Sequence, residues 1–219
     1  MSSTDTSAYD KSQPLIPVTP DEWDARFSET PDEWYFGRDP SDLARLTYGY
    51  WKTLQPELPA HVLDFGCGEG RDAVFFSQKG FEVTAVDGSH VALAKLNRLA
   101  NENIAHIASV QQVELDSFPI TSQYSVVSAH NSLQFIGKKM PGTIRHMKAI
   151  APSGAFHAIS GFSDEAEVTH DNPDLYVLKR GELKQMYSDW FVLYYSEEIL
   201  WREPSQNFFS FAKIIAHKP

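Results

Sequence analysis

The 219-residue chain has a single cysteine, Cys67, so it can form no internal disulfide, and this favours a reducing, cytoplasmic environment. No apolar run approaches the ~20 residues that cross a bilayer, and the polar N-terminus lacks the features of a secretory signal. Basic residues are also few, 19 against 29 acidic ones, which gives a formal net charge of −10. Because a phosphate backbone repels such a chain and no basic stripe is present, we expect neither nucleic acid nor membrane as a partner.

Length and an ordinary apolar content of 42% predict one domain with a sizeable core. Residues 1–20, rich in Ser, Thr, Asp and Pro, are expected to form a disordered tail, and residues 21–219 the folded domain. Runs rich in Val, Ile, Ala and Phe then alternate with helical patterns, which predicts βαβ units and a parallel sheet. The expected strands cover 61–65, 82–87, 109–115, 124–129 and 154–160, and the expected helices cover 42–54 (with Ser41 as N-cap), 71–79, 89–101 and 141–150.

The C-terminal third changes character. A helix is predicted at about residues 180–188, followed by two apolar strands, at 190–195 and 208–217, with only a short link between them. Strands joined in this way pair antiparallel, so a hairpin is expected at one edge of the sheet. The polar loop 161–178 has a length typical of lids and binding loops, and its His170 and Asp171 would either orient an acceptor or lie in solvent. Its acidity favours a cationic or neutral acceptor.

The most informative segment is Val62–Arg71, which has the pattern of a buried strand and a glycine loop that opens a helix. Its three glycines allow the backbone to approach a ligand closely. A second buried strand ends at Asp87, where a carboxylate can accept both hydroxyls of a ribose. The unit predicts an adenosine-binding site; the alternative is a strand–turn–helix without a ligand. The dinucleotide pattern requires a glycine where Arg71 stands, which argues against an NAD-dependent oxidoreductase.

The pattern D-x-G-x-G-x-G from Asp64, together with Asp87 and the C-terminal hairpin, resembles the class I S-adenosylmethionine (SAM) methyltransferases. Within them the chain is similar to the small tellurite-resistance and thiopurine-type enzymes over Trp34–Ser41, Val62–Asp87 and Glu182–Tyr194. The resemblance implies an α/β fold: a Rossmann-like seven-stranded mixed sheet, strand seven antiparallel beside strand five, with helices on both faces. It also implies SAM as cofactor, S-adenosylhomocysteine (SAH) as product, and in-line methyl transfer to a small-molecule nucleophile (S, N, O or a chalcogen).

The resemblance further implies which residues surround the cofactor. The loop after Asp64 would hold the methionine part, with Cys67 packed beside it, and Asp87 would hold the ribose. The adenine amine would contact either Glu114 or Asp116, a choice that stays open. The full expected set is Trp34, Arg38, Asp64, Gly66, Cys67, Gly68, Gly70, Asp87, Gly88, Glu114, Leu115, Asp116, Ala129 and His130.

His130 is the candidate general base, because strand ends in open α/β sheets face the ligand crevice; the alternative is a hydrogen-bonded core histidine. Trp34, Tyr35 and Phe36 would form either an aromatic lid over the sulfonium or a hydrophobic plug that fastens the N-terminal segment to the sheet. Arg38 would pair with the SAM carboxylate or an anionic substrate, or else lie on the surface. The expected substrate-binding set is Tyr35, Phe36, Asn131, Phe162 and His170.

No metal site is expected, because the other histidines lack ligand spacing, and His157 is expected to be structural. A rival function is a catalytically silent SAM-binding module that acts through a protein partner. Both a monomer and a homodimer are compatible with the sequence.

Overall fold

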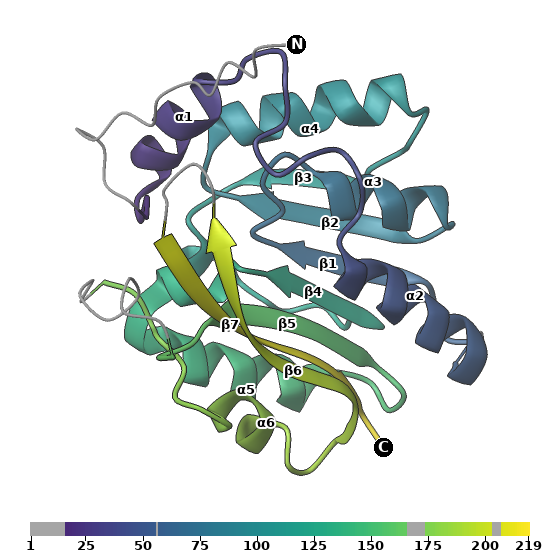
Figure 1. Cartoon of the computed structure of the whole chain (residues 1–219). Coiled ribbons are helices and arrows are strands. Elements are labelled where there is room, and N and C mark those ends of the chain that lie inside the picture. The colour runs from purple at the N-terminus through teal and green to yellow at the C-terminus, as the bar shows by residue number, and fades with distance from the viewer. Residues whose placement is uncertain (1–15, 56, 166–173, 203–206) are drawn as a thin grey trace, which may run out of the picture.

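The computed structural model describes residues 16–55, 57–165, 174–202 and 207–219. A seven-stranded sheet runs through the centre in the order β3-β2-β1-β4-β5-β7-β6 (Figure 1). The parallel strands are β1 (His61–Phe65), β2 (Glu82–Asp87), β3 (Ser109–Gln112), β4 (Val126–His130) and β5 (Phe156–Phe162). The last strand, β7 (Asn207–His217), runs antiparallel between β5 and β6 (Phe191–Arg202), which confirms the predicted mixed sheet.

Helices cover both faces of the sheet, as predicted. One face carries α2 (Asp42–Leu54), α3 (Arg71–Gln78) and α4 (His90–Glu102), and the other carries α5 (Met140–Ile150) and α6 (Glu182–Met186). Successive strand residues point to opposite faces, and in β1 both Val62 and Leu63 are fully buried. Burial on both faces is why the strands read as continuous apolar runs rather than alternating ones.

The helices begin where their capping residues are. The Ser41 hydroxyl accepts a hydrogen bond from the Ala44 N–H, which confirms the predicted start of α2, and Ser89 caps α4 in the same way. Many boundaries differ from the prediction by one or two residues, and two differ by three residues or more. The third strand ends at Gln112, because Leu115–Ser117 forms a short 3-10 helix, η1, and β6 continues to Arg202, well beyond the predicted 195.

The N-terminal segment packs on the fold earlier than the predicted boundary at residue 20. Residues 1–15 of the predicted tail lie outside the described residues, but Ile16 is buried against Phe209 and Phe211 of β7. A helix that was not predicted, α1 (Pro20–Ser28), follows, and its first turn is closed by a reciprocal capping box between Thr19 and Glu22. In Figure 1, α1 lies on the side of the sheet where the parallel strands end, and this position makes it part of the site.

Candidate active site

A cavity of about 370 Å³ lies at the carboxyl ends of β1, β2 and β4. This is the point where the strand order reverses, since β1 has β2 on one side and β4 on the other, and it is where open α/β sheets bind ligands. The cavity is lined from four directions: by the glycine loop, by the ends of β2 and β4, by η1, and by the N-terminal segment. The lining residues used below are Pro20, Trp23, Phe27, Tyr35, Phe36, Asp64, Gly66, Cys67, Gly68, Glu69, Gly70, Arg71, Asp87, Gly88, Glu114, Leu115, Asp116, His130, Asn131 and Phe135.

The three glycines of the loop all have left-handed backbone conformations, but they serve two purposes. A Cβ on Gly66 would lie 2.2 Å from the Ser132 Cβ, and one on Gly70 would lie 2.4 Å from the Leu96 Cγ, so both are required by packing. Around Gly68 the nearest atom to such a Cβ is a Phe27 ring carbon at 4.0 Å. Gly68 is therefore the glycine that leaves space in the cavity itself.

Asp87 is held in a fixed orientation at the end of β2. One carboxylate oxygen accepts the Gly68 N–H at 2.8 Å and the other accepts the Ser89 N–H at 2.9 Å. Burial raises the pKa of Asp87, although these amide hydrogen bonds oppose the shift. Next to it, a Cβ on Gly88 would lie 2.9 Å from the Pro20 Cγ, so the N-terminal segment closes directly over this position.

Asp64 carries a buried oxygen that lacks a hydrogen-bond partner among the described residues. Its side chain is 2% exposed, and within the described residues its Oδ2 atom is buried without a hydrogen-bond partner. Burial, with the charges of Asp72 and Asp87 as lesser causes, raises the pKa of Asp64 to about 8. A buried carboxylate in this state is suited to a cationic ligand, since a positive charge beside it would restore the ionised form. The ammonium group of SAM fits this requirement.

Arg71, and not the expected Arg38, is the arginine that lines the cavity. Its Nη1 donates to the Phe36 carbonyl at 2.8 Å, and its positive charge is near enough to oppose the rise in the pKa of Asp64. Arg38 lies outside, ion-paired with Glu102 and stacked over the Trp34 ring at 4.4 Å. Arg71 was missed as a site residue although a local signal exists, since it directly follows Gly70 of the glycine loop. The position of Arg38 depends on how the N-terminal segment packs on α4.

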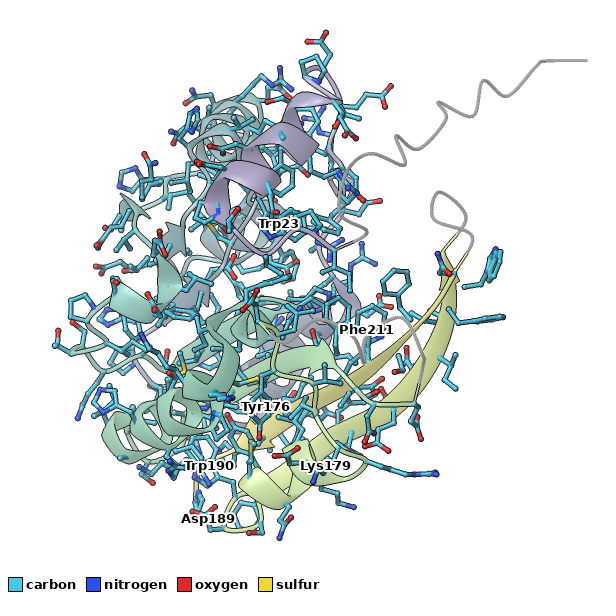
Figure 2. All side chains as sticks on the ribbon, turned by 90° about the vertical axis from the view of Figure 1, so that its left-hand side faces the viewer. Trp23, Tyr176, Lys179, Asp189, Trp190 and Phe211 are labelled. Atoms are coloured by element: carbon cyan, nitrogen blue, oxygen red, sulfur yellow. The ribbon has the colours of Figure 1, made fainter. Side chains whose placement is uncertain are left out.

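Of the expected aromatic lid, Tyr35 and Phe36 line the cavity and Trp34 does not. Trp34 packs against Val74 and Leu99 with the Arg98 guanidinium over its ring, which is the alternative role of a hydrophobic plug. The lid is completed by rings that were not predicted as site residues. Trp23 stacks on Phe27 at 5.3 Å and meets Phe135 edge-on at 5.5 Å, while Phe36 meets Tyr35 at 4.8 Å. Trp23 is marked in Figure 2, on the face where the strands end.

His130 lies at the end of β4 and borders the cavity together with Asn131. Its Nδ1 is 3.0 Å from the Ser160 hydroxyl, which donates to the Asn131 side-chain oxygen at 2.8 Å. Ser160 thus fixes the orientation of the imidazole, and no sequence signal pointed to it. Ala129 is fully buried and does not line the cavity, because its side chain points into the core beneath the strand end.

The segment that follows β3 and enters η1 contributes Glu114, Leu115 and Asp116, all of which line the cavity. Asp116 is engaged by Lys139 at 2.6 Å, and this hydrogen bond lowers its pKa. No hydrogen bond or ion pair engages the Glu114 side chain within the described residues. Glu114 therefore has both carboxylate oxygens available to a ligand, whereas Asp116 already shares one with Lys139.

The remaining expected residues lie elsewhere. Phe162 does not line the cavity: it is buried in a cluster with Phe209 and Phe211, 5.3 Å from the latter ring, and packs against the cavity-lining Phe135 at 6.4 Å. His170 lies outside the described residues. His157 is fully buried, with its Nδ1 2.8 Å from the Tyr187 hydroxyl, and burial lowers its pKa to about 3, as a structural histidine requires.

No group of three or more His, Cys, Asp or Glu side chains in the described part of the chain is placed to hold a metal ion. None of the described helices combines the length and apolar character needed to span a membrane.

The strand order, the antiparallel β7 and a glycine loop facing Asp87 across the switch point define the class I SAM-dependent methyltransferase fold. Residues 43–203 match the family model described as "Tellurite resistance protein TehB". The chain belongs to this family.

The chain is also similar to individual proteins. The chain is 28% identical over 142 residues to a probable S-adenosyl-L-methionine-dependent methyltransferase TehB of Haemophilus influenzae, which covers 64% of this chain and 49% of that protein. It is 30% identical over 150 residues to hemagglutinin 1 of Eikenella corrodens, covering 68% and 49%. The crystal structure of TehB from Haemophilus influenzae superposes with a TM-score of 0.68 at 24% identity, covering 80% of this chain and 62% of that one. The chain thus spans about half the length of the curated relatives it matches.

Proposed function

We propose that the chain is a SAM-dependent methyltransferase for a small-molecule acceptor, with residues 21–219 as its single catalytic domain. The observation that carries this proposal is the buried Asp64 oxygen, which has no hydrogen-bond partner in the described part of the chain and lies beside Arg71 and Asp87 in one cavity. SAM supplies, when bound, a methyl group on an electron-poor sulfonium. Asp64 would bind its ammonium group, Arg71 its carboxylate and Asp87 its ribose hydroxyls. Glu114 is the better candidate for the adenine amine, since Lys139 already engages Asp116.

The aromatic layer defines the acceptor side of the proposed site. Trp23, Phe27 and Phe36 border the space beyond Asp64, and such rings attract a sulfonium by about 0.5–2 kcal/mol while excluding water. His130 and Arg71 also border a second cavity, of about 530 Å³, between α2 and the β6–β7 hairpin, and this cavity provides a route for the acceptor. An aromatic, water-poor wall favours a soft nucleophile, sulfur or a heavier chalcogen, over an amine or hydroxyl. His130 would accept a proton where the nucleophile still carries one.

Calorimetry with SAM and SAH tests the cofactor assignment directly. Methyl transfer from isotopically labelled SAM is then measured to matched acceptors that share one aromatic skeleton and carry a thiol, an amine or a hydroxyl. We expect the thiol to be the best acceptor. A preference for the amine would contradict the soft-nucleophile assignment, and SAM binding without turnover of any acceptor would favour the silent SAM-binding module instead.

The cellular setting of this activity follows from the composition. One cysteine supports a cytoplasmic location, and the net charge of −10 argues against nucleic acid as substrate. We propose a monomer or homodimer that acts without a membrane partner.

A further inference from the structure

One buried ion pair in the structure has no part in the proposed chemistry. Glu69 belongs to the glycine loop and Lys95 to α4, and the two residues are 4% and 5% exposed. The Lys95 Nζ lies 2.9 Å from Glu69 Oε1. Since burying two charges removes both from water, such a pair persists only where its remaining hydrogen bonds are also made.

The remaining hydrogen bonds of Lys95 all go to the N-terminal segment. Its Nζ donates to the Thr30 carbonyl at 2.6 Å and the Glu33 carbonyl at 3.0 Å, with the Thr30 hydroxyl at 3.4 Å. The other Glu69 oxygen accepts the Phe36 N–H at 3.3 Å. Residues 30–36 include two of the cavity's aromatic rings, and one buried ammonium and one buried carboxylate fasten them to α4 and the glycine loop. Two arginines add hydrogen bonds to the same segment, Arg71 to the Phe36 carbonyl and Arg98 to the Pro31 carbonyl.

We propose that Lys95 and Glu69 are positioning residues that hold the aromatic roof, residues 16–36, closed over the cofactor site. Neither reaches the reacting atoms. Glu69 lies between Gly68 and Gly70, so the carboxylate that fixes Phe36 is part of the loop that would hold the methionine moiety. The glycine loop and the aromatic rings on the acceptor side are thereby held in a fixed relative position. In-line methyl transfer requires that position to be correct to within about 1 Å. This inference rests on the proposed function for its consequence and on the observed contacts for its geometry.

The test uses the full chain in two variants, because K95M alone would leave the Glu69 charge buried without a partner and would endanger folding. The double variant E69Q/K95M removes both charges and keeps an amide oxygen that can accept the Phe36 N–H. The matched control is K148M. Lys148 is also largely buried and also donates to a carbonyl, that of Met186 at 2.6 Å, but it lies outside the cavity lining.

Two readouts are used. The first is trypsin cleavage after Arg26, measured by mass spectrometry without ligand; Arg26 is buried, and its Nη1 donates to the Tyr35 hydroxyl at 3.2 Å, so it is protected while the roof is closed. The second is the dissociation constant of SAH. If the closed roof falls to about one tenth of the population, the apparent constant rises roughly tenfold.

We expect faster cleavage at Arg26 and weaker SAH binding in E69Q/K95M, and neither change in K148M, whatever its melting temperature. Wild-type protection and affinity in E69Q/K95M would overturn the proposal, and so would equal effects in K148M, because the effect would then be general destabilisation. Failure of the wild type to bind SAH would refute the proposed function instead. The ligand-free cleavage measurement would still decide whether Lys95 and Glu69 hold the roof.

Discussion

Replacing Asp64 with asparagine tests the electrostatics of the cavity. The folded pKa of Asp64 is about 8 against an ordinary 3.8, because burial disfavours the ionised form. Since the folded pKa is the higher one, the folded state binds the extra proton between these two values. The contribution of Asp64 to stability is therefore fully present below pH 3.8 and is lost as the pH rises towards 8.

The size of this loss follows from the shift. A rise of about four pKa units, at about 1.4 kcal/mol each, sets a ceiling on the order of 5 kcal/mol at alkaline pH. The asparagine side chain of D64N carries no charge at any pH, so the variant avoids the loss. We expect D64N and wild type to differ little in free energy of unfolding near pH 4. The difference should grow in favour of D64N as the pH rises and reach several kcal/mol at about pH 8.

Urea unfolding of the ligand-free proteins across this range measures the difference. Titrating groups that do not interact with Asp64 cancel in the comparison. Asp72 and Asp87 do not cancel fully, because their charges act on Asp64 and its charge acts on them. A difference that stays constant with pH would refute the raised pKa. Calorimetry with SAH in two buffers of different ionisation enthalpy supplies the functional half: near neutral pH the wild type should release about one proton on binding, while D64N should bind more weakly and release none.

Three further predictions concern single residues. D87A should weaken SAM and SAH binding by about 2 kcal/mol, roughly thirtyfold in calorimetry, because a charged acceptor of the ribose hydroxyls is lost; unchanged affinity would refute the ribose assignment. G68A should fold, at a cost of about 1–2 kcal/mol for its left-handed backbone, and should bind SAH more weakly. G66A should unfold at a much lower urea concentration, because its added methyl group would clash with Ser132. The folded pKa of His157 is lowered to about 3 from 6.5, so its contribution to stability is present above pH 6.5 and lost as the pH falls below it. H157Q should therefore show a smaller loss of stability between about pH 6 and 4 in thermal unfolding, and an unaltered acid profile would contradict the depressed pKa.

The sheet could be predicted from the sequence because its signals are local. Apolar runs, the Ser41 cap and the spacing from the glycine loop to Asp87 each depend on neighbouring residues, and the structure confirms the resulting elements. The helix α1 was missed although a local signal exists, since Thr19 and Glu22 form a readable capping box before it. Its aromatic residues, Trp23 and Phe27, are four positions apart and share one face of the helix, and both line the cavity.

The arrangement of the site could not be predicted in the same way, because it depends on long-range packing. Trp34 and Tyr35 are adjacent in the chain, yet one fills a gap against α4 and the other borders the cavity. Lys95 and Glu69 are separated by 26 positions, and no pattern in either segment predicts that the two residues pair. The position of Arg38 outside the cavity has the same origin, since it depends on where the N-terminal segment lies on α4.

The two buried carboxylates of the glycine-loop region show how the fold divides anchoring from binding. Glu69 and Asp64 line the same cavity and are almost equally buried. Glu69 is given an internal cation, Lys95, and both its oxygens are used by the protein. Among the residues that the structure describes, Asp64 has one oxygen without a hydrogen-bond partner, and its pKa is strongly raised. An unpaired buried carboxylate destabilises the ligand-free protein. The presence of Asp64 beside Glu69, whose charge Lys95 neutralises, is therefore best explained by a cation that the ligand brings. SAH retains that cation, its ammonium group, but lacks the sulfonium, so Asp64 should discriminate little between donor and product, and any preference for SAM should arise in the aromatic layer.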